Sequence, residues 1–325
     1  MESTRNQLID LLARNSDRFI SGQMLSEHLN ITRSAIWKHM KELEKDGYVI
    51  EGVSKKGYRI IRFPDKVSEN TIKWGLDTEW LGNTIIHKEQ TTSTQHIAHQ
   101  AAQNGAAHGT IIVADEQTQG KGRLQRPWHS AKNLGIWLSI IIRPSILPYL
   151  APQLTLMTAT VLADVLHNKG IEPKIKWPND ILINQSKVAG ILTEMQAEQD
   201  QIQYIVIGIG MNVNHKQHDL PEDVNRKATS LTIETNKSWD INKLIQDILK
   251  QFEDTYADYI DNGFIDIKKN WENYGFRIGK PIYISTLKEK WAGKFLGIAE
   301  DGALLTTDKN GDTCKIYSAD IDWLV

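Results

Sequence analysis

Glycines, cations and one indole gather in a single short stretch of the sequence. Residues 117–128, Gln-Thr-Gln-Gly-Lys-Gly-Arg-Leu-Gln-Arg-Pro-Trp, contain two glycines, three cations and a tryptophan. Because glycine lets backbone amides come close to a ligand, and Lys or Arg brings positive charge to a phosphate or carboxylate, this stretch is a candidate anion site. The same composition is typical of a flexible surface loop, and the residues alone do not decide between the two.

The spacing of the glycines argues against two common nucleotide-binding loops. No Gly-Lys-Ser/Thr follows a glycine at the distance that a P-loop needs, and the stretch 208–213 lacks the third glycine of a dinucleotide-binding fingerprint. Cys314 is the single cysteine, so it can form neither an internal disulfide nor a thiolate zinc cage. We therefore expect no cysteine chemistry, and we assign no residue as a metal ligand.

Two more polar clusters follow along the chain. Lys176-Trp-Pro-Asn-Asp180 stands between a predicted helix that ends near Lys169 and a predicted strand at 181–183, where Pro-Asn-Asp is also ordinary turn chemistry. Lys187 opens a predicted strand at 188–194, and taken alone it would be a solvent-facing lysine at the end of that strand. Asn212 follows the apolar stretch 204–210, which predicts a central strand.

The elements that must position these clusters mix helices and strands. The pattern predicts a helix near 68–77, a strand near Ile85, a helix from Thr94 to Asn104 and a strand from Thr110 to Glu116. Residues 240–260 and 264–274 are predicted helices, and 279–325 short strands with turn signals at 300–302 and 309–311. This order predicts an α+β layer fold.

Charge is distributed unevenly along the chain. Residues 1–62 hold 11 Lys and Arg against 8 Asp and Glu, whereas the remaining residues hold 27 against 32. A basic segment on an otherwise acidic protein is typical of contact with a phosphate backbone. The N-terminus lacks the order of a signal peptide, and the longest nearly apolar run, 134–142, is nine residues long. Because a membrane helix needs about 18 apolar residues, we expect a cytoplasmic protein without a membrane span.

The basic segment has the pattern of a winged helix. A first helix is predicted from Thr4 to about Arg14, Ser21 caps a second, and Thr32 caps a third whose apolar stripe faces the core. Two alternating strands, 48–52 and 57–61, follow as a hairpin with basic residues at its tip. A solvated interaction module with a lysine face is the alternative. The predicted DNA-binding residues are Gly22, Thr32, Arg33, Ser34, Trp37, Lys38, Lys41, Lys45, Lys55 and Lys56.

Four motifs, taken together, resemble one enzyme family. They are Gly-Lys-Gly-Arg-x-x-Arg-x-Trp at 120–128, Lys-Trp-Pro-Asn-Asp at 176–180, Lys-x-x-Gly-x-Leu-x-Glu at 187–194 and Gly-x-Gly-x-Asn at 208–212. In this order and spacing they resemble the biotin protein ligases. With a winged helix in front, the chain from about Thr4 to Leu324 resembles the bifunctional form, which is both ligase and biotin operon repressor.

The resemblance implies three domains. Residues 1–63 would form a winged helix-turn-helix, 64–274 a catalytic domain similar to class II aminoacyl-tRNA synthetases, with a mixed sheet and helices, and 275–325 an SH3-like β-barrel. It also implies two chemical steps: biotin and ATP with Mg²⁺ give biotinoyl-AMP, and a lysine of the biotin carboxyl carrier protein of acetyl-CoA carboxylase, or of another biotin-dependent carboxylase, takes the biotinoyl group. Biotinoyl-AMP would also be the corepressor for binding operator DNA as a homodimer.

The same resemblance implies which residues bind each ligand and which are catalytic. Biotin would be held by Ser93, Thr94, Gln95, Gln117, Lys121, Gly122, Arg123 and Lys187. The adenylate would be held by Trp128, Lys176, Asn179 and Asn212, and the catalytic residues would be Lys187, Arg123, Arg126 and Asp180. Within these roles, Lys187 would neutralise the biotin carboxylate and the α-phosphate, and Asn179 and Asp180 would organise the phosphate and Mg²⁺ region.

Two positions depart from the family pattern. Lys121 stands where many members have arginine, and lysine keeps the charge but loses the planar fork. Gln95 stands where some members have asparagine after Ser-Thr, and its side chain is one methylene longer with the same amide.

Two other functions compete with this interpretation: a ligand-sensing winged-helix repressor without ligase activity, and a lipoate or other acyl-carrier ligase of related fold.

Overall fold

The computed structural model describes residues 4–15, 17–45, 47–221, 227–286 and 289–324. The chain divides into two compact units, Met1–Asp77 and Thr78–Val325. The boundary lies later than the one predicted at residue 63. Phe63 stacks on Trp74 with ring centroids 3.8 Å apart and also meets Tyr48 at 5.2 Å, so the chain after the hairpin still packs on the first unit. The predicted helix near 68–77 is the short α4 (Glu69–Lys73) of this unit, not an element of the central domain.

The first unit has the predicted helix and strand order. Its helices are α1 (Thr4–Ala13), α2 (Gly22–Leu29) and α3 (Arg33–Lys45), followed by the antiparallel hairpin of β1 (Val49–Val53) and β2 (Gly57–Arg62). The hydroxyl of Ser21 caps α2 by accepting a hydrogen bond from the Met24 amide at 3.1 Å. The core contains Leu8, Leu12, Leu25, Ile36, Met40 and Leu43, each at most 2% exposed. The predicted apolar stripe of the third helix is therefore confirmed.

The hairpin is tied to the helical part by backbone contact. Ile20 and Tyr58 exchange two hydrogen bonds of 2.9 Å between their backbone groups. Gly57, next to this bridge, has a φ of +115°, and a Cβ there would lie 1.9 Å from the carbonyl oxygen of Ile20. Only glycine fits at this corner, because the backbone conformation and the approach of the second chain segment both exclude a side chain.

The second unit is built on a mixed sheet of seven strands in the order β3-β4-β5-β9-β8-β7-β6. The strands are β3 (Ile85–Lys88), β4 (Ile111–Ala114), β5 (Gly135–Ile142), β6 (Lys174–Lys176), β7 (Asp180–Ile183), β8 (Ser186–Glu198) and β9 (Gln201–Asn212). Strands β3 and β4 pair in parallel, and all the other neighbours are antiparallel. The α+β prediction for this region is confirmed.

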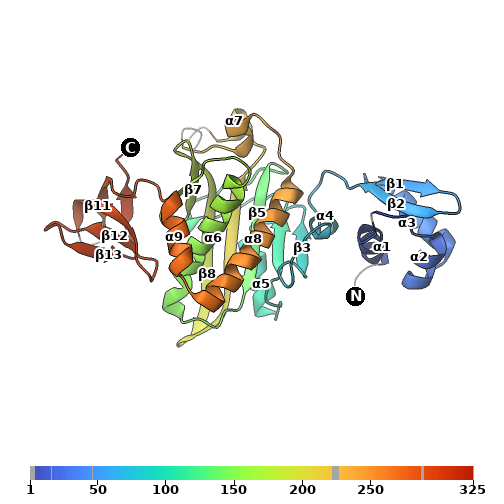
Figure 1. The fold of residues 1–325 in the computed structure, drawn as a ribbon, viewed down its shortest axis with the longest axis horizontal. Helices are drawn as coiled ribbons and strands as arrows, with labels where there is room; N and C mark the ends of the chain where they lie inside the picture. Colours follow the sequence, from blue (N-terminus) through green and yellow to red (C-terminus); the bar gives the residue numbers. More distant parts are fainter. Residues whose placement is uncertain (1–3, 16, 46, 222–226, 287–288, 325) are drawn as a thin grey trace. The chain divides into compact units, whose positions relative to one another are not determined.

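Helices cover the sheet unequally. The helices α6 (Ala151–His167), α8 (Ile241–Asn262) and α9 (Ile265–Tyr274) form one layer against it (Figure 1). Thr155 of α6 hydrogen-bonds Thr193 of β8 at 2.8 Å, so odd-numbered positions of this part of β8 face that layer. Positions 190, 192 and 194 therefore face the opposite side. There α5 (Thr94–Gln103) packs Ala98 and Ala102 against Ile112, Ile141 and Val206.

The helix α6 is strongly apolar along its length. The segment Pro148–His167 is long and apolar enough to cross a membrane by length and composition alone, and 72% of its most apolar window is buried inside the protein. Most of its side chains pack on the sheet and on α8 and α9. Burial of this kind is typical of the core helix of a globular domain, which passes the same test of composition.

The C-terminal strands form an antiparallel sheet in the order β13-β12-β11-β10-β14. They are β10 (Pro281–Ser285), β11 (Lys290–Ile298), β12 (Leu304–Thr307), β13 (Thr313–Ile316) and β14 (Asp320–Asp322), with turns at both predicted hairpins. The sheet belongs to the second compact unit: Gln153 of α6 donates to the Glu300 carbonyl at 2.6 Å, and the Trp177 indole to the Gly302 carbonyl at 3.2 Å. No pairing of β13 with β14 closes the described strands into a ring, so the SH3-like barrel stays a prediction.

Candidate functional site

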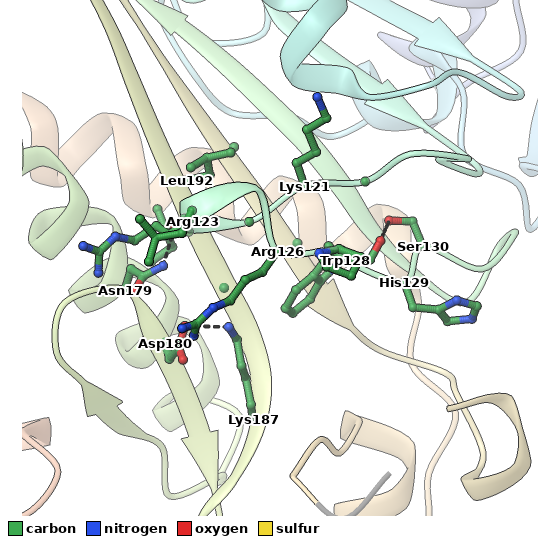
Figure 2. Close-up of a pocket in the computed structure, with 18 of the residues that line it drawn as sticks. Lys121, Arg123, Arg126, Trp128, His129, Ser130, Asn179, Asp180, Lys187 and Leu192 are labelled. Carbon is green, nitrogen blue, oxygen red and sulfur yellow. Dashed lines mark hydrogen bonds and ion pairs between the residues drawn. The ribbon is translucent and has the colours of Figure 1, made fainter. Parts of the chain in front are cut away.

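A cavity of about 1040 Å³ opens on the face of the large sheet opposite α6. It is lined by the glycine-rich loop 117–128, the ends of β7, β8 and β9, the start of α5 and parts of the C-terminal sheet. Figure 2 shows side chains of this loop together with Asp180 of β7 and Lys187 of β8. Its volume matches the upper end of the ~300–1,000 Å³ usual for small-molecule pockets. The cavity is therefore large enough for a ligand with two parts, such as a vitamin joined to a nucleotide.

Three glycines make its floor. Gly190 on β8 and Gly208 and Gly210 on β9 lie in adjacent paired positions, where Gly190 pairs with Gly210. A Cβ at 208 would lie 2.7 Å from Oε1 of Gln95, and one at 210 would lie 2.6 Å from Nε1 of Trp128. A Cβ at 190 would lie 3.1 Å from Nζ of Lys187. Each glycine thus leaves room for one polar side chain to lie flat on the sheet.

The loop above the floor is hydrogen-bonded to itself. The amide of Trp128 donates to the Gly120 carbonyl and that of Gly122 to the Arg126 carbonyl, both at 2.8 Å. Residues 123–125 form a tight turn and not a regular helix, because Leu124 and Gln125 have φ values of 56° and 59°, in the left-handed region. In this structure the loop is a folded hairpin, not an extended surface segment.

Cations converge from two elements. Nζ of Lys187 lies 2.6 Å from Oδ1 of Asp180 and 5.0 Å from the centre of the Trp128 ring. Figure 2 shows Arg126 reaching toward the same pair, and its guanidinium lies 3.6 Å from the Asp320 carboxylate of the C-terminal sheet. Partial burial lowers the pKa of Arg123, with the Asp180 charge opposing this shift. A site with three cations and few carboxylates favours an anionic ligand.

The other end of the cavity is lined by polar groups that hydrogen-bond to one another, and none of these groups is a cation. Oε1 of Gln117 accepts from the Thr94 amide at 2.8 Å and from the Thr94 hydroxyl at 3.1 Å, while its Nε2 donates to Oγ of Ser130 at 2.8 Å. Ser139, fully buried, lies 2.8 Å from the Thr94 hydroxyl and 2.9 Å from Oε1 of Gln95. Such a network of neutral donors and acceptors suits an uncharged amide or urea.

Three of the groups predicted to hold the adenylate also line the cavity. Nε1 of Trp128 is buried and has no hydrogen-bond partner among the described residues. Asn212, 5% exposed, donates to the Thr229 carbonyl at 3.0 Å, and Asn179, 9% exposed, to the Ile191 carbonyl at 2.8 Å. An unpaired buried donor beside a glycine floor fits a flat polar ligand that would complete its hydrogen bonding.

The structure brings nearly all the predicted ligand-binding residues to this one cavity. The residues that line it include Ser93, Thr94, Gln95, Gln117, Lys121, Gly122, Arg123, Arg126, Trp128, Asn179, Asp180, Lys187 and Asn212. The described lining does not include Lys176, whose Nζ lies 5.8 Å from the Trp323 ring, and burial lowers the pKa of this lysine. Its predicted contact with the adenylate has no support in this geometry.

Several lining residues were missed in the sequence. Ser139 lies within the otherwise apolar stretch 135–142, and a lone hydroxyl in a buried strand was the available signal. Lys290 and Asp320 come from the C-terminal sheet, and nothing in their local sequence marks them. Their place depends on how that sheet packs on α6 and α9.

The first unit has a separate candidate surface on α3 and the hairpin tip. The predicted cations of α3 and the hairpin are exposed, and the Trp37 side chain is 56% exposed. Arg33 donates to Gln23 and Lys41 pairs with Glu44, both at 2.6 Å. Thr32 caps α3 by accepting from the Ala35 amide at 3.2 Å, and Gly22 begins α2. An exposed helix face with cations and an aromatic ring has the chemistry to enter a nucleic-acid groove.

Both units match known families. Residues 4–59 match the model of an HTH domain, and residues 87–212 that of the biotin/lipoate A/B protein ligase family. The bifunctional ligase/repressor BirA of Bacillus subtilis is 47% identical over 324 residues, with 99% of each chain covered. The protein of the same name from Escherichia coli is 28% identical over 300 residues, covering 92% of this chain and 91% of that one. This chain belongs to the bifunctional ligase/repressor family.

A solved structure of the ligase part agrees with the fold. The biotin protein ligase of Aquifex aeolicus, in complex with biotin and ATP, has a TM-score of 0.64 and is 29% identical. The match covers 74% of this chain and 98% of that one. As a member of the bifunctional family, this chain has the winged helix in addition to the region that it shares with the Aquifex aeolicus ligase.

Proposed function

We propose that this protein is an ATP-dependent biotin protein ligase and also a biotinoyl-AMP-dependent repressor of biotin genes. One observation carries the ligase part: a single cavity joins a neutral hydrogen-bonding end to a cationic end across a glycine floor. Biotin has a neutral ureido ring and a carboxylate, and ATP brings phosphates and a flat base. The cavity offers each of these a matching surface.

The neutral end supports the orientation of biotin. Within the described contacts, one of the two N–H groups of Gln117 is taken up by Ser130, which leaves the other for a carbonyl oxygen of the ligand. The hydroxyls of Thr94 and Ser93 can accept from ligand N–H groups. The ureido ring, with one carbonyl and two N–H groups, would therefore bind at this end, and its carboxylate would extend toward Lys187.

The cationic end supports adenylation. An oxygen of the biotin carboxylate attacks the α-phosphorus of ATP, and pyrophosphate leaves. This step brings two anionic groups together, and Lys187, Arg123 and Arg126 would stabilise the charge that develops between them. Lys187 would leave its pair with Asp180 for these oxygens. No enzyme nucleophile is needed, so positioning and charge account for the catalysis.

Mg²⁺ would enter with the ATP phosphates. The described residues contain no group of three or more His, Cys, Asp or Glu that could hold a metal ion by themselves. Because Mg²⁺ often takes one or two carboxylates together with substrate phosphates, Asp180 is the carboxylate placed to share it. Mg²⁺ would neutralise the charge of the pyrophosphate as it leaves.

The second step and the regulation complete the proposal. The amine of a carrier-protein lysine attacks the biotinoyl carbonyl carbon, an amide forms, and AMP leaves.

The winged helix supports operator binding, and because one such unit makes few contacts, a homodimer on two half-sites would be the DNA-binding form. Both activities would belong in the cytoplasm, because they need a carrier protein and operator DNA as partners.

Transfer to a carrier domain separates this function from its alternatives. Purified protein is incubated with labelled biotin, ATP, Mg²⁺ and a biotin carboxyl carrier domain, with labelled lipoate in a parallel reaction. We expect label on the carrier lysine only with biotin and ATP present. Biotin binding without transfer would point to a repressor that lacks ligase activity, and transfer of lipoate alone would point to a lipoate ligase.

A further inference from the structure

A hydrogen-bonded chain runs behind the polar end of the cavity and ends at a carboxylate outside it. Gln95, 7% exposed, donates from Nε2 to Oε2 of Glu194 at 2.9 Å, and its Oε1 lies 2.9 Å from the Ser139 hydroxyl. The same Nε2 lies 3.3 Å from the Leu192 carbonyl and 3.4 Å from the Val206 carbonyl. All the groups around Nε2 are acceptors.

Glu194 is held in place from the other side. Its Oε2 lies 3.2 Å from Nε2 of His99, whose Nδ1 lies 3.3 Å from the Tyr204 hydroxyl. The hydrogen bond from His99 lowers the pKa of Glu194, and the amide of Gln95 and the charge of Lys121 add to this, against the opposing effect of burial. The carboxylate therefore stays ionised and accepts hydrogen bonds only.

An ionised carboxylate decides which way a glutamine amide points. The two ends of the amide have almost the same shape, so packing does not distinguish them. A reversed amide would place Oε1 against Glu194 and against two backbone carbonyls, where acceptors would face acceptors. With the amide fixed, Oε1 accepts the one proton of Ser139, so Ser139 cannot also donate to Thr94. The proton of the Thr94 hydroxyl is then shared between Ser139 at 2.8 Å and Oε1 of Gln117 at 3.1 Å.

We propose that Glu194 is a positioning residue for biotin recognition: it fixes the amide of Gln95 and, through Ser139 and Thr94, the donors and acceptors that the cavity offers to the ureido ring. This inference rests on the proposed ligase function. It assigns a role to a side chain that is itself 40% exposed and whose contacts lie behind Gln95. Its effect is on the affinity and selectivity for the ureido ring, not on the chemical step at the carboxylate.

The test is Glu194→Gln, which keeps the size of the side chain but removes the charged acceptor at 2.9 Å and leaves only the two longer contacts with backbone carbonyls to orient the Gln95 amide. Biotin-dependent exchange of pyrophosphate into ATP gives kcat and the KM values for biotin and ATP. We expect the KM for biotin to rise about tenfold, the loss of roughly one hydrogen bond, while kcat and the KM for ATP change little. Glu198→Gln, an exposed position on the same strand with the same loss of charge, is the matched control.

The selectivity for biotin over an analogue is a second measurement, and a purely structural role of Glu194 would leave this selectivity unchanged. A biotin analogue with one ureido nitrogen methylated lacks one donor, and the wild-type protein should discriminate against it. In Glu194→Gln the ratio of kcat/KM for biotin over the analogue should narrow. His99→Gln, which removes one partner of Glu194 and leaves the pocket side chains unchanged, should shift the KM for biotin in the same direction by a smaller factor.

The outcomes separate the two proposals. If the wild-type protein shows no biotin-dependent exchange, the ligase function itself is wrong. If the wild type is active and both variants keep its KM for biotin and its selectivity, the positioning role of Glu194 is wrong while the function stands. A fall in kcat together with an equal rise in both KM values would also overturn the role, because it would indicate general disruption of the site.

Discussion

Lys187 is the side chain on which the proposed chemistry depends most directly. It lies at the start of β8, where a lysine would ordinarily extend into solvent. Instead its Nζ is 2.6 Å from Asp180 and above the Trp128 ring, and its side chain is 30% exposed. A cation held by a carboxylate next to a ligand cavity is ready to exchange that partner for a substrate anion.

Lys187→Met should therefore remove most adenylate formation while the fold is kept. Methionine is of similar length and leaves the charge of the two reacting anions uncompensated. Loss of one such electrostatic group costs about 10²–10³ in rate. Pyrophosphate exchange measures the step, with Lys174→Met on the edge strand β6, two strands from β8, as the control at an exposed lysine. Exchange at the wild-type rate would remove Lys187 from its role.

His215 gives the second unit a dependence on pH. Its side chain is fully buried, and neither ring nitrogen has a hydrogen-bond partner among the described residues. Burial lowers its pKa from 6.5 to about 4, with the charge of His129 adding to the shift and that of Asp219 opposing it. The folded protein thus binds this proton only near pH 4, whereas the unfolded chain binds it near pH 6.5.

The sign of the effect follows from this difference. Between these two pKa values the unfolded chain binds more protons, so the contribution to stability is complete above pH 6.5 and is lost as the pH falls toward 4. The total loss is about 3 kcal/mol by the linkage relation. Urea unfolding at pH 7.5, 6 and 5 should show a smaller loss of stability for His215→Leu than for the wild type. His218→Leu, at an exposed histidine, should behave as the wild type, and equal pH slopes in all three would contradict the account.

At the scale of elements, the hairpin of the first unit depends on one glycine corner. Gly57 combines a positive φ with a close approach to the Ile20 carbonyl, so Gly57→Ala must separate β2 from the segment that it bridges. We expect the first unit to lose about 2–4 kcal/mol, because strain and broken hydrogen bonds combine. Operator affinity should fall while pyrophosphate exchange is kept. Gly105→Ala, also at positive φ but with nothing within 4 Å of its Cβ, is the control for conformational strain alone.

Much of this architecture could be predicted from local signals. The three N-terminal helices, the central helix after Ser93 and the strands 181–183 and 204–210 follow from caps and apolar periodicity, and the structure confirms each of them. The helix α4 was assigned to the wrong unit, because its position is decided by Phe63 stacking on Trp74, a contact that spacing does not reveal. Closure of the C-terminal sheet also depends on pairing between strands distant in sequence.

The candidate site was predictable only through its motifs taken together. Each cluster alone had an ordinary interpretation as a loop or turn, and the loop 117–128 could have been mobile. What the sequence could not show is the floor of Gly190, Gly208 and Gly210, because their alignment depends on the register of β8 with β9. The position of Lys176 outside the described lining depends likewise on a long-range contact, because its neighbour Trp323 is more than a hundred residues away.

At the scale of the whole molecule, the two activities belong to separate units of the chain. The second unit, Thr78–Val325, contains the complete cavity, and the match to the Aquifex aeolicus ligase covers 98% of that chain. A protein of residues 78–325 should therefore keep ligation within a few-fold and lose operator binding. A cut at residue 63 would instead leave α4 and Trp74 without Phe63, so this version should be less soluble and less stable. Loss of ligation in a folded 78–325 protein would show that the units are not independent.

In the proposed function, one chain couples biotin chemistry to DNA binding. A ligand can shift dimer assembly only if it binds the dimer-competent state more tightly than the other state. A coupling free energy of about 1–3 kcal/mol would change the dimerisation constant by roughly 5–150-fold. Exposed Lys38, Lys41, Lys45, Lys55 and Lys56 supply phosphate contacts, so operator affinity should also fall steeply with salt.

The most direct measurement is fluorescence anisotropy of a labelled duplex from the control region of the biotin genes, titrated with the full chain. One titration contains biotin, ATP and Mg²⁺, and the other contains none of them, with an unrelated duplex of equal length as the control. We expect tighter binding of the operator, as a dimer, only when biotinoyl-AMP can form, and no such gain for Lys187→Met. Equal operator affinity with and without biotin and ATP would contradict it.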